Sequence, residues 1–195
     1  MPDRVDPDDA QSGLDGGPMD AAITDARATD TGADVDSGVR VLRVFVTSST
    51  KNGNLGGLAG GDKICNDLAL AAGLSGVFSA WLSDNGGAGP HAINRVTSPG
   101  PWRLVSGEVV AATKAVLSSG AIAHAIDHDE KGVAVAASKV WTGTGPNGLY
   151  LTNDCDKWTT GANGRVGITT AVDASWTSTS VDGCGQPRRL YCFQL

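Results

Sequence analysis

The chain has 195 residues and a formal net charge of −6, which is enough chain for one medium-sized domain and a tail. The charge is uneven, because residues 1–40 hold ten Asp and three Arg, a net charge of −7, whereas residues 41–195 have a net charge of +1. A nearly neutral domain lacks the basic surface that phosphate binding requires, so nucleic acid is excluded as the expected partner.

Residues 1–40 are predicted to form an acidic, disordered linker or stalk, and residues 41–195 the folded domain. The first segment has no aromatic residue and few large aliphatic ones, so it cannot bury enough apolar surface to offset its ordering entropy. No stretch reaches the roughly 18 apolar residues of a membrane span. No export signal is visible, because Met1 leads straight into acidic residues. The expectation is that the native protein carries an export signal, with a lipoprotein anchor, that this chain lacks.

The first predicted strand is Val41–Thr47, which is β-branched and apolar. The glycine-rich stretch GNLGGLAGGDKIC follows, but Asp62 occupies the place of the lysine of a phosphate-binding loop, so we expect these glycines to allow close backbone packing instead. A helix is predicted next, with Asp62 near its start and Gly73 at its end. Its inward residues, at helical spacing, are Ile64, Cys65, Leu68, Ala69 and Ala72.

The remaining elements are predicted to be short. A second helix is expected within Ala112–Ser119, and a turn at Thr144–Gly148. The predicted strands are Val77–Ser83, Trp102–Val105, Val133–Ala137, Lys139–Thr144 and Leu190–Leu195. Many short strands, two helices and long loops indicate an α+β fold.

The four cysteines indicate two disulfides and an oxidising compartment. Cys65, Cys155, Cys184 and Cys192 are widely spaced, and no pair has the C-x-x-C spacing of a zinc ribbon or a thioredoxin-like site. Four cysteines allow three connectivities, and spacing does not choose among them.

Three segments in the same order resemble endostatin, the C-terminal fragment of certain collagens. The first is GNLGGLAGGDKICNDLALAAGLSGVFSAWLS, and the second is VWTGTGPNGLYLTNDCDKWTT. The third is the pair Cys184 and Cys192, which stand eight residues apart with Cys192 in the last predicted strand. The chain from residue 41 onward is similar to the bacterial endostatin-like domains of surface lipoproteins, a domain family of unknown function.

The resemblance implies a C-type-lectin-like fold, with a mixed, twisted sheet, two flanking helices and long loops. It also implies a nested disulfide pattern, in which Cys65 pairs with Cys192 outside and Cys155 pairs with Cys184 inside. The zinc-binding histidines of vertebrate endostatin have no counterpart before Val41. The calcium motifs of lectins are incomplete here, because Gln186-Pro187 is followed by Arg188.

The strongest metal-like cluster is His124, Asp127, His128 and Asp129, with Glu130 beside it. Its turn-rich context favours a solvated acidic loop over a metal site, so no metal and no cofactor are expected. No catalytic residue is expected either, because the chain has no Gly-x-Ser-x-Gly motif and His91 stands alone in a loop.

Ligand binding is predicted on two long loops, Ser83–Pro101 and Thr159–Gly185, with Trp176 and Asn85 as candidate contacts. Together these features predict a non-enzymatic, extracellular or cell-surface recognition domain that binds a protein of the matrix type or a polysaccharide. The alternatives are a glycan-active enzyme on a lectin-like scaffold and a purely structural envelope protein.

Overall fold

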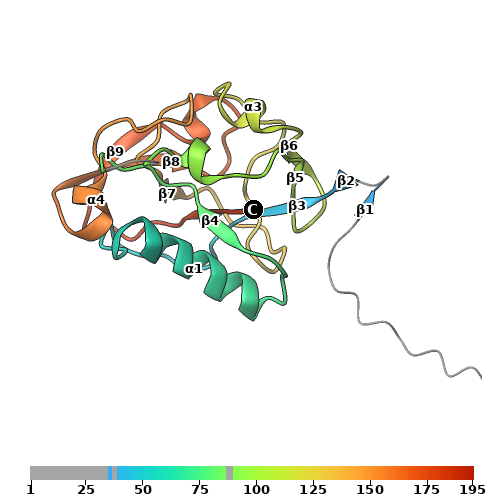
Figure 1. Cartoon of the computed structure of the whole chain (residues 1–195). Coiled ribbons are helices and arrows are strands. Elements are labelled where there is room, and N and C mark those ends of the chain that lie inside the picture. The colour runs from blue at the N-terminus through green and yellow to red at the C-terminus, as the bar shows by residue number, and fades with distance from the viewer. Residues whose placement is uncertain (1–34, 37–38, 87–89) are drawn as a thin grey trace, which may run out of the picture.

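The structure is a computed structural model, and it describes residues 35–36, 39–86 and 90–195 (Figure 1). The described residues form a mixed α+β arrangement with one long helix, α1 (Gly57–Ala71). The other helices are single turns: α2 (Ala92–Arg95), α3 (Lys114–Leu117), α4 (Cys155–Thr159) and the 3-10 turn η1 (Ala174–Trp176). Most of the predicted linker lies outside the described residues. Two short strands, β1 (Val35–Asp36) and β2 (Val39–Arg40), pair with each other at its end.

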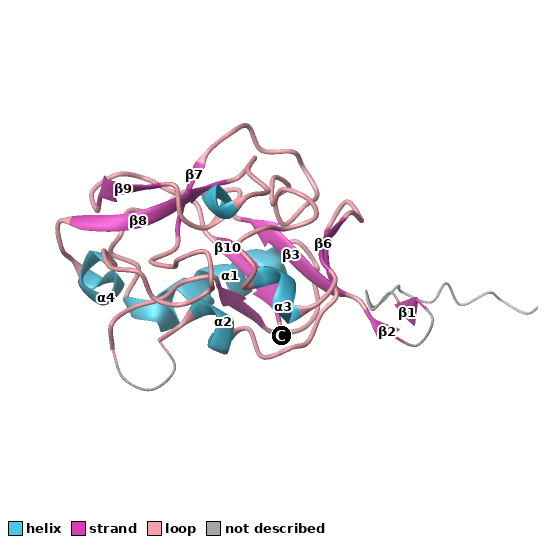
Figure 2. Ribbon diagram, turned by 90° about the horizontal axis from the view of Figure 1, so that it is seen from above, coloured by secondary structure: helices cyan, strands magenta, loops and turns pink. Residues whose placement is uncertain are grey.

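The larger sheet has five strands in the order β4-β10-β3-β5-β6. These strands are β3 (Leu42–Val46), β4 (Phe78–Ala80), β5 (Trp102–Leu104), β6 (Val109–Ala111) and β10 (Tyr191–Gln194). The last strand, β10, lies between β3 and β4 and is antiparallel to both, whereas β3 and β5 are parallel, so the sheet is mixed. Figure 2 shows β10 beside β3. A second, antiparallel sheet consists of β7 (Lys139–Trp141), β8 (Asn163–Ile168) and β9 (Ser180–Gly183).

The two faces of the five-stranded sheet bury two hydrophobic clusters. Successive side chains of a strand point to opposite faces, so Val44 and Val46 enter one cluster and Phe45 the other. In β10, Tyr191 and Phe193 pack with the first cluster, and Cys192 with the second. The first cluster also holds Trp81, Trp102 and Trp176, and the second holds Trp141 and Trp158.

The glycine-rich stretch serves the packing of α1, as the sequence predicts. Gly56 and Gly57 have φ of 82° and 79°, and a Cβ on Gly61 would lie 2.6 Å from Leu82 Cδ1. The helix therefore starts within this stretch, earlier than predicted, and Asp62 lies inside it rather than near its start.

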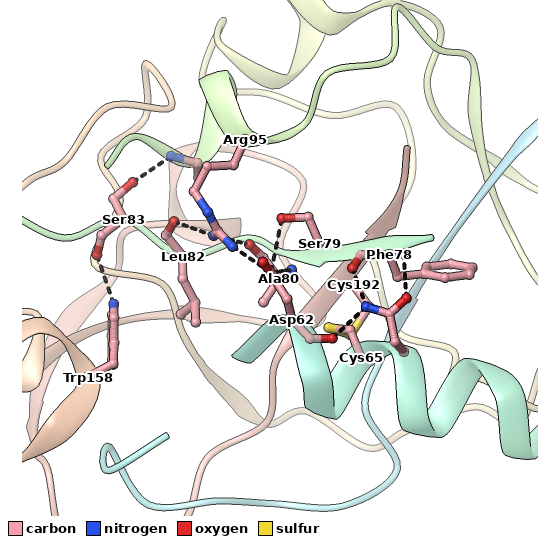
Figure 3. Close-up of polar contacts among 12 residues, drawn as sticks. Asp62, Cys65, Phe78, Ser79, Ala80, Leu82, Ser83, Arg95, Trp158 and Cys192 are labelled. Carbon is pink, nitrogen blue, oxygen red and sulfur yellow. Dashed lines mark hydrogen bonds and ion pairs between the residues drawn. A yellow bond between two sulfur atoms is a disulfide. The ribbon is translucent and has the colours of Figure 1, made fainter. Parts of the chain in front are cut away.

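Side chains of α1 and α2 occupy the outer edge of β4 (Figure 3). The amide of Asn66 donates to Phe78 O at 2.7 Å and accepts from Phe78 N at 2.9 Å. Asp62 Oδ1 accepts from Ala80 N at 2.8 Å, and Arg95 Nη1 donates to Ala80 O at 2.7 Å. Arg95 also forms an ion pair with Asp62. The backbone groups on this edge are thus hydrogen-bonded without a further strand.

The disulfides have the pairing that the resemblance implies. Cys65 pairs with Cys192, which joins α1 to the central strand β10, and Cys155 pairs with Cys184, which joins α4 to the residue after β9. The sequence separations are 127 and 29 residues.

Two sequence predictions of secondary structure are wrong. Val133–Ala137 forms no strand, and only an isolated bridge from Ala134 to His128 is present there. The segment Thr159–Gly185 is not one long loop, because it contains β8, η1 and β9. The second helix, predicted within Ala112–Ser119, is present as the single turn α3.

The hydroxyl of Tyr191 offers a test of the core. It is buried and has no hydrogen-bond partner among the described residues, and burial raises the pKa of Tyr191 strongly. Because a buried, unpaired hydroxyl costs about 1–3 kcal/mol, we expect Tyr191→Phe to raise the free energy of unfolding by about 1 kcal/mol. Urea denaturation would measure it. Trp102→Phe is the control, since Trp102 Nε1 donates to Gln194 O at 2.9 Å, and this variant should lose stability.

Candidate functional site

The predicted loop Ser83–Pro101 meets a second segment that sequence reasoning did not assign to the site. Trp158 Nε1 donates to Ser83 O at 2.9 Å (Figure 3), and Asn85 N donates to Asp154 Oδ2 at 3.0 Å. We call the surface formed by Asn85, Gly86 and Leu149–Asn153 the loop face. Figure 1 shows the neighbouring helix α4 at the end of the molecule opposite β1 and β2.

The backbone beside the loop face is left-handed. Thr152 and Asn153 have φ of 35° and 64°, and the four consecutive residues Cys155–Trp158 have φ between 51° and 61°. None of these residues is glycine, and the left-handed conformation costs roughly 1–2 kcal/mol for residues other than Gly, Asn and Asp, which here are Thr152, Cys155, Lys157 and Trp158. The bond from Trp158 N to Asp154 O, 2.7 Å long, closes Cys155–Trp158 into a left-handed turn.

Packing around the disulfide holds the left-handed turn in place. The amides of Leu55 and Gly56 both donate to Trp158 O, at 2.9 and 3.1 Å, and Trp158 is fully buried. Gly53 and Gly164 lie against the Cys155 sulfur, because a Cβ on them would fall 2.3 and 2.6 Å from it. The surrounding structure therefore fixes a conformation that the local sequence disfavours.

Two aspartates lie beneath the loop face. Asp84 and Asp154 are buried, and Asp84 Oδ1 accepts from Gly86 N at 2.9 Å. Burial raises the pKa of Tyr150, and the charges of Asp154 and Asp84 raise it further. In the described residues neither aspartate forms an ion pair, so backbone amides are their partners.

Both apolar and polar side chains are exposed on the loop face. Leu149 and Leu151 are each 39% exposed, on either side of the partly buried Tyr150. Asn85, the predicted ligand contact, is also exposed in the structure. The signal that could have indicated the leucines is their alternation directly after the Thr144–Gly148 turn.

Trp176 cannot serve as the predicted surface contact. It is fully buried, with its ring centroid 5.0 Å from that of Trp81 and 5.8 Å from that of Tyr191. Its Ser and Thr neighbours suggested exposure. However, Thr177 is itself buried and accepts a hydrogen bond from Trp81 Nε1 at 2.8 Å.

The residues of the candidate metal cluster are engaged in local contacts. His128 Nδ1 lies 2.8 Å from Asp127 Oδ1, and His124 Nδ1 lies 2.8 Å from Ala125 O. The carboxylate of Asp129 accepts the backbone amides of Lys131 and Val133, each at 2.9 Å. Across the described part of the chain, no three His, Cys, Asp or Glu side chains converge in a way that could hold a metal ion.

The basic residues near the C-terminus form ion pairs and hydrogen bonds within the chain. Arg188 and Lys139 both pair with Asp182, at 2.6 and 2.7 Å. Burial opposes the charge of Asp182, but the hydrogen bonds from Lys139 and Arg188 outweigh it and lower the pKa of this carboxyl group. Arg189 donates to the backbone oxygens of Thr47 and Ser48. An extended anion such as heparin would have to compete with these contacts.

Comparisons with known proteins do not identify a family for this chain. Neither the search of protein-family models nor that of the curated proteins finds a match to this chain. Within residues 35–36, 39–86 and 90–195, no helix is both long enough and apolar enough to cross a bilayer.

The left-handed turn leads to a prediction about glycine. Glycine adopts positive φ without the steric penalty of other residues, so Lys157→Gly should match the wild-type free energy of unfolding or exceed it by up to about 1 kcal/mol. The matched control is Lys63→Gly in the exposed middle of α1, which should lose about 1 kcal/mol. Thermal and urea denaturation measure both. Equal losses in the two variants would contradict the strain assigned to the turn.

Proposed function

We propose that this chain is a non-enzymatic recognition domain of the endostatin-like family, with a C-type-lectin-like fold, that acts outside the cell or on its surface. Its ligand is a matrix-type protein or a polysaccharide, bound through the loop face. The proposal includes a lipoprotein anchor ahead of the acidic linker. The two disulfides are compatible with an extracellular setting.

Several features of the fold support the family assignment. The disulfides are nested, and the last strand β10 lies beside the first strand of the domain, β3. A single long helix, α1, packs on the mixed sheet and is linked to β10 by Cys65. These features correspond to what the sequence resemblance implies.

The observation that carries the function is the strained backbone under the loop face. A run of non-glycine residues with positive φ lowers the stability of the fold, and such strain concentrates at functional sites. Here Leu151 directly precedes the run, and Asp154, whose carboxylate accepts from Asn85 N, lies between its two parts, so the run restrains the backbone on both sides of the loop face. A preformed surface loses little conformational entropy on binding, which favours recognition.

The chemistry of the loop face predicts how binding responds to solution conditions. Two exposed leucines and an amide bind through apolar contact and hydrogen bonds, so raising the salt concentration should change affinity little. A polyanion held by counterion release would instead dissociate steeply as salt rises.

An array of glycans and matrix proteins, probed at low and high salt and with and without EDTA, tests the proposal. Ligands found there are re-measured with Leu149→Asn/Leu151→Asn and with Asn85→Ala, which should each weaken binding at least about fivefold. Val181→Asn is the matched control, because Val181 is 41% exposed on β9 and should leave affinity unchanged. Loss of binding in EDTA would return attention to His124, Asp127, His128 and Asp129.

One observation favours the glycan-active enzyme as a second candidate. Asp84 and Asp154 are two carboxylic acids beneath the same surface, and paired carboxylates are the usual machinery of glycoside hydrolysis. Release of reducing sugar from array-positive polysaccharides, abolished by Asp154→Asn with the fold retained, would establish this function instead.

A further inference from the structure

We propose that the Cys155–Cys184 disulfide is a releasable latch, whose reduction lets the left-handed turn Cys155–Trp158 relax while the rest of the domain stays folded. The latch rests on the geometry of the turn, and only its effect on ligand binding rests on the proposed function.

The two disulfides differ in access to a reductant. Both cysteines of Cys65–Cys192 are 0% exposed, between α1 and the sheet. Cys155 is also 0% exposed, but Cys184 is 7% exposed and follows the sheet edge strand β9. Thiol–disulfide exchange needs attack along the sulfur–sulfur axis, and Cys184 is the only one of the four cysteines with exposed surface, so we expect an external thiolate to attack its sulfur first.

Backbone strain favours movement of the left-handed turn once the disulfide is broken. Four consecutive non-glycine residues, Cys155–Trp158, hold φ between 51° and 61°, a conformation that L residues leave unless it is enforced. The disulfide lies at the first of these residues. Without it, Cys155 loses its covalent link, whereas Trp158 keeps its burial, the bond from its Nε1 to Ser83 O and the amides bonded to its backbone oxygen. We therefore expect the start of the run to relax most.

The change is expected to stay local. The Cys65–Cys192 bond, the hydrogen bonds of Asn66 and Asp62 to β4, and the pairing of β10 with β3 and β4 involve none of the turn residues. The loop face is affected because Asp154, which holds Asn85 N, lies directly before Cys155. Local opening without global unfolding is common for segments with few partners of their own.

The chemistry is a two-electron thiol–disulfide exchange with an external dithiol. One thiolate of the dithiol attacks the Cys184 sulfur, and Cys155 leaves as a thiolate. The second thiol of the reductant then displaces the Cys184 thiolate. Both cysteines take up protons, and the dithiol is oxidised to its cyclic disulfide.

The test is reduction of the intact chain with graded dithiothreitol, followed by alkylation and peptide mass spectrometry. Cys155 and Cys184 should be alkylated at least about tenfold faster than Cys65 and Cys192. Hydrogen exchange of the same samples should rise at residues 152–160 and remain slow in α1 and β10. Simultaneous labelling of all four cysteines, or unchanged exchange at residues 152–160, would overturn the proposal.

A variant separates relaxation of the turn from simple loss of a cross-link. In Asp156→Gly/Lys157→Gly the turn is no longer strained at two of its positions, so reduction should raise exchange there clearly less than in the wild-type chain. Gly185→Ala is the control, because a Cβ there meets no atom within 4 Å and should leave the wild-type response unchanged. An equal rise in the glycine variant and the wild type would show that strain does not drive the release.

Discussion

Replacing both Cys65 and Cys192 with alanine is expected to lower the free energy of unfolding by about 5 kcal/mol. The bond closes a loop of 127 residues, and chain entropy in the unfolded state scales with the logarithm of loop length. Domains of this size are stable by only about 5–15 kcal/mol, so the variant should be close to unfolded at 37 °C. Equilibrium urea denaturation of the oxidised protein and the variant measures the difference.

The second disulfide is the internal comparison for this result. Cys155→Ala/Cys184→Ala opens a loop of 29 residues, so chain entropy alone gives a loss of about 3.5 kcal/mol. Relaxation of the left-handed turn should reduce this loss further. An equal or greater loss than for Cys65 and Cys192 would contradict the account of both bonds.

Gly53→Ala is expected to lower the free energy of unfolding by about 3 kcal/mol. Its new Cβ would lie 2.3 Å from Cys155 Sγ and 3.1 Å from Cys184 Cβ, which is closer than carbon and sulfur can approach. Both neighbours belong to the disulfide, so neither can rotate away, and overpacking of this kind typically costs 1–3 kcal/mol or more. The shift in melting temperature measures the cost.

Substitutions at two further glycines provide a second test of this contact and a control. Gly164→Ala meets the same sulfur at 2.6 Å and should be similarly destabilising, whereas Gly185→Ala meets no atom within 4 Å and should be neutral. A neutral Gly53→Ala would mean that the disulfide does not lie against this stretch of backbone.

The main strands and α1 could be predicted from the sequence because their residues carry a clear period. Val44, Phe45 and Val46 alternate between the two faces of the sheet, and Cys65 and Ala69 lie one helical turn apart on the buried face of α1. The pairing of the cysteines could not be deduced from spacing. It followed only from the resemblance to endostatin.

The candidate site was harder to predict than the fold, because burial and backbone conformation there depend on residues far away in the sequence. Trp176 stands among Ser and Thr, yet its neighbour Thr177 is buried because the Thr177 hydroxyl is hydrogen-bonded to Trp81 Nε1 at 2.8 Å, a long-range contact that the sequence does not reveal. The left-handed turn has no local signal at all, because its conformation is imposed by the disulfide and by the burial of Trp158. Asn85 is exposed in the structure, and its part in ligand binding stays a prediction.

The occupied edge of β4 bears on how this protein behaves when it is crowded. An open strand edge can recruit a strand from a neighbouring molecule and so begin aggregation or domain swapping. Here Asn66, Asp62 and Arg95 already satisfy the backbone groups of Phe78 and Ala80 that an incoming strand would need. Polymerisation of the main sheet along this side is therefore blocked by three polar side chains rather than by a covering domain, even at high protein concentration.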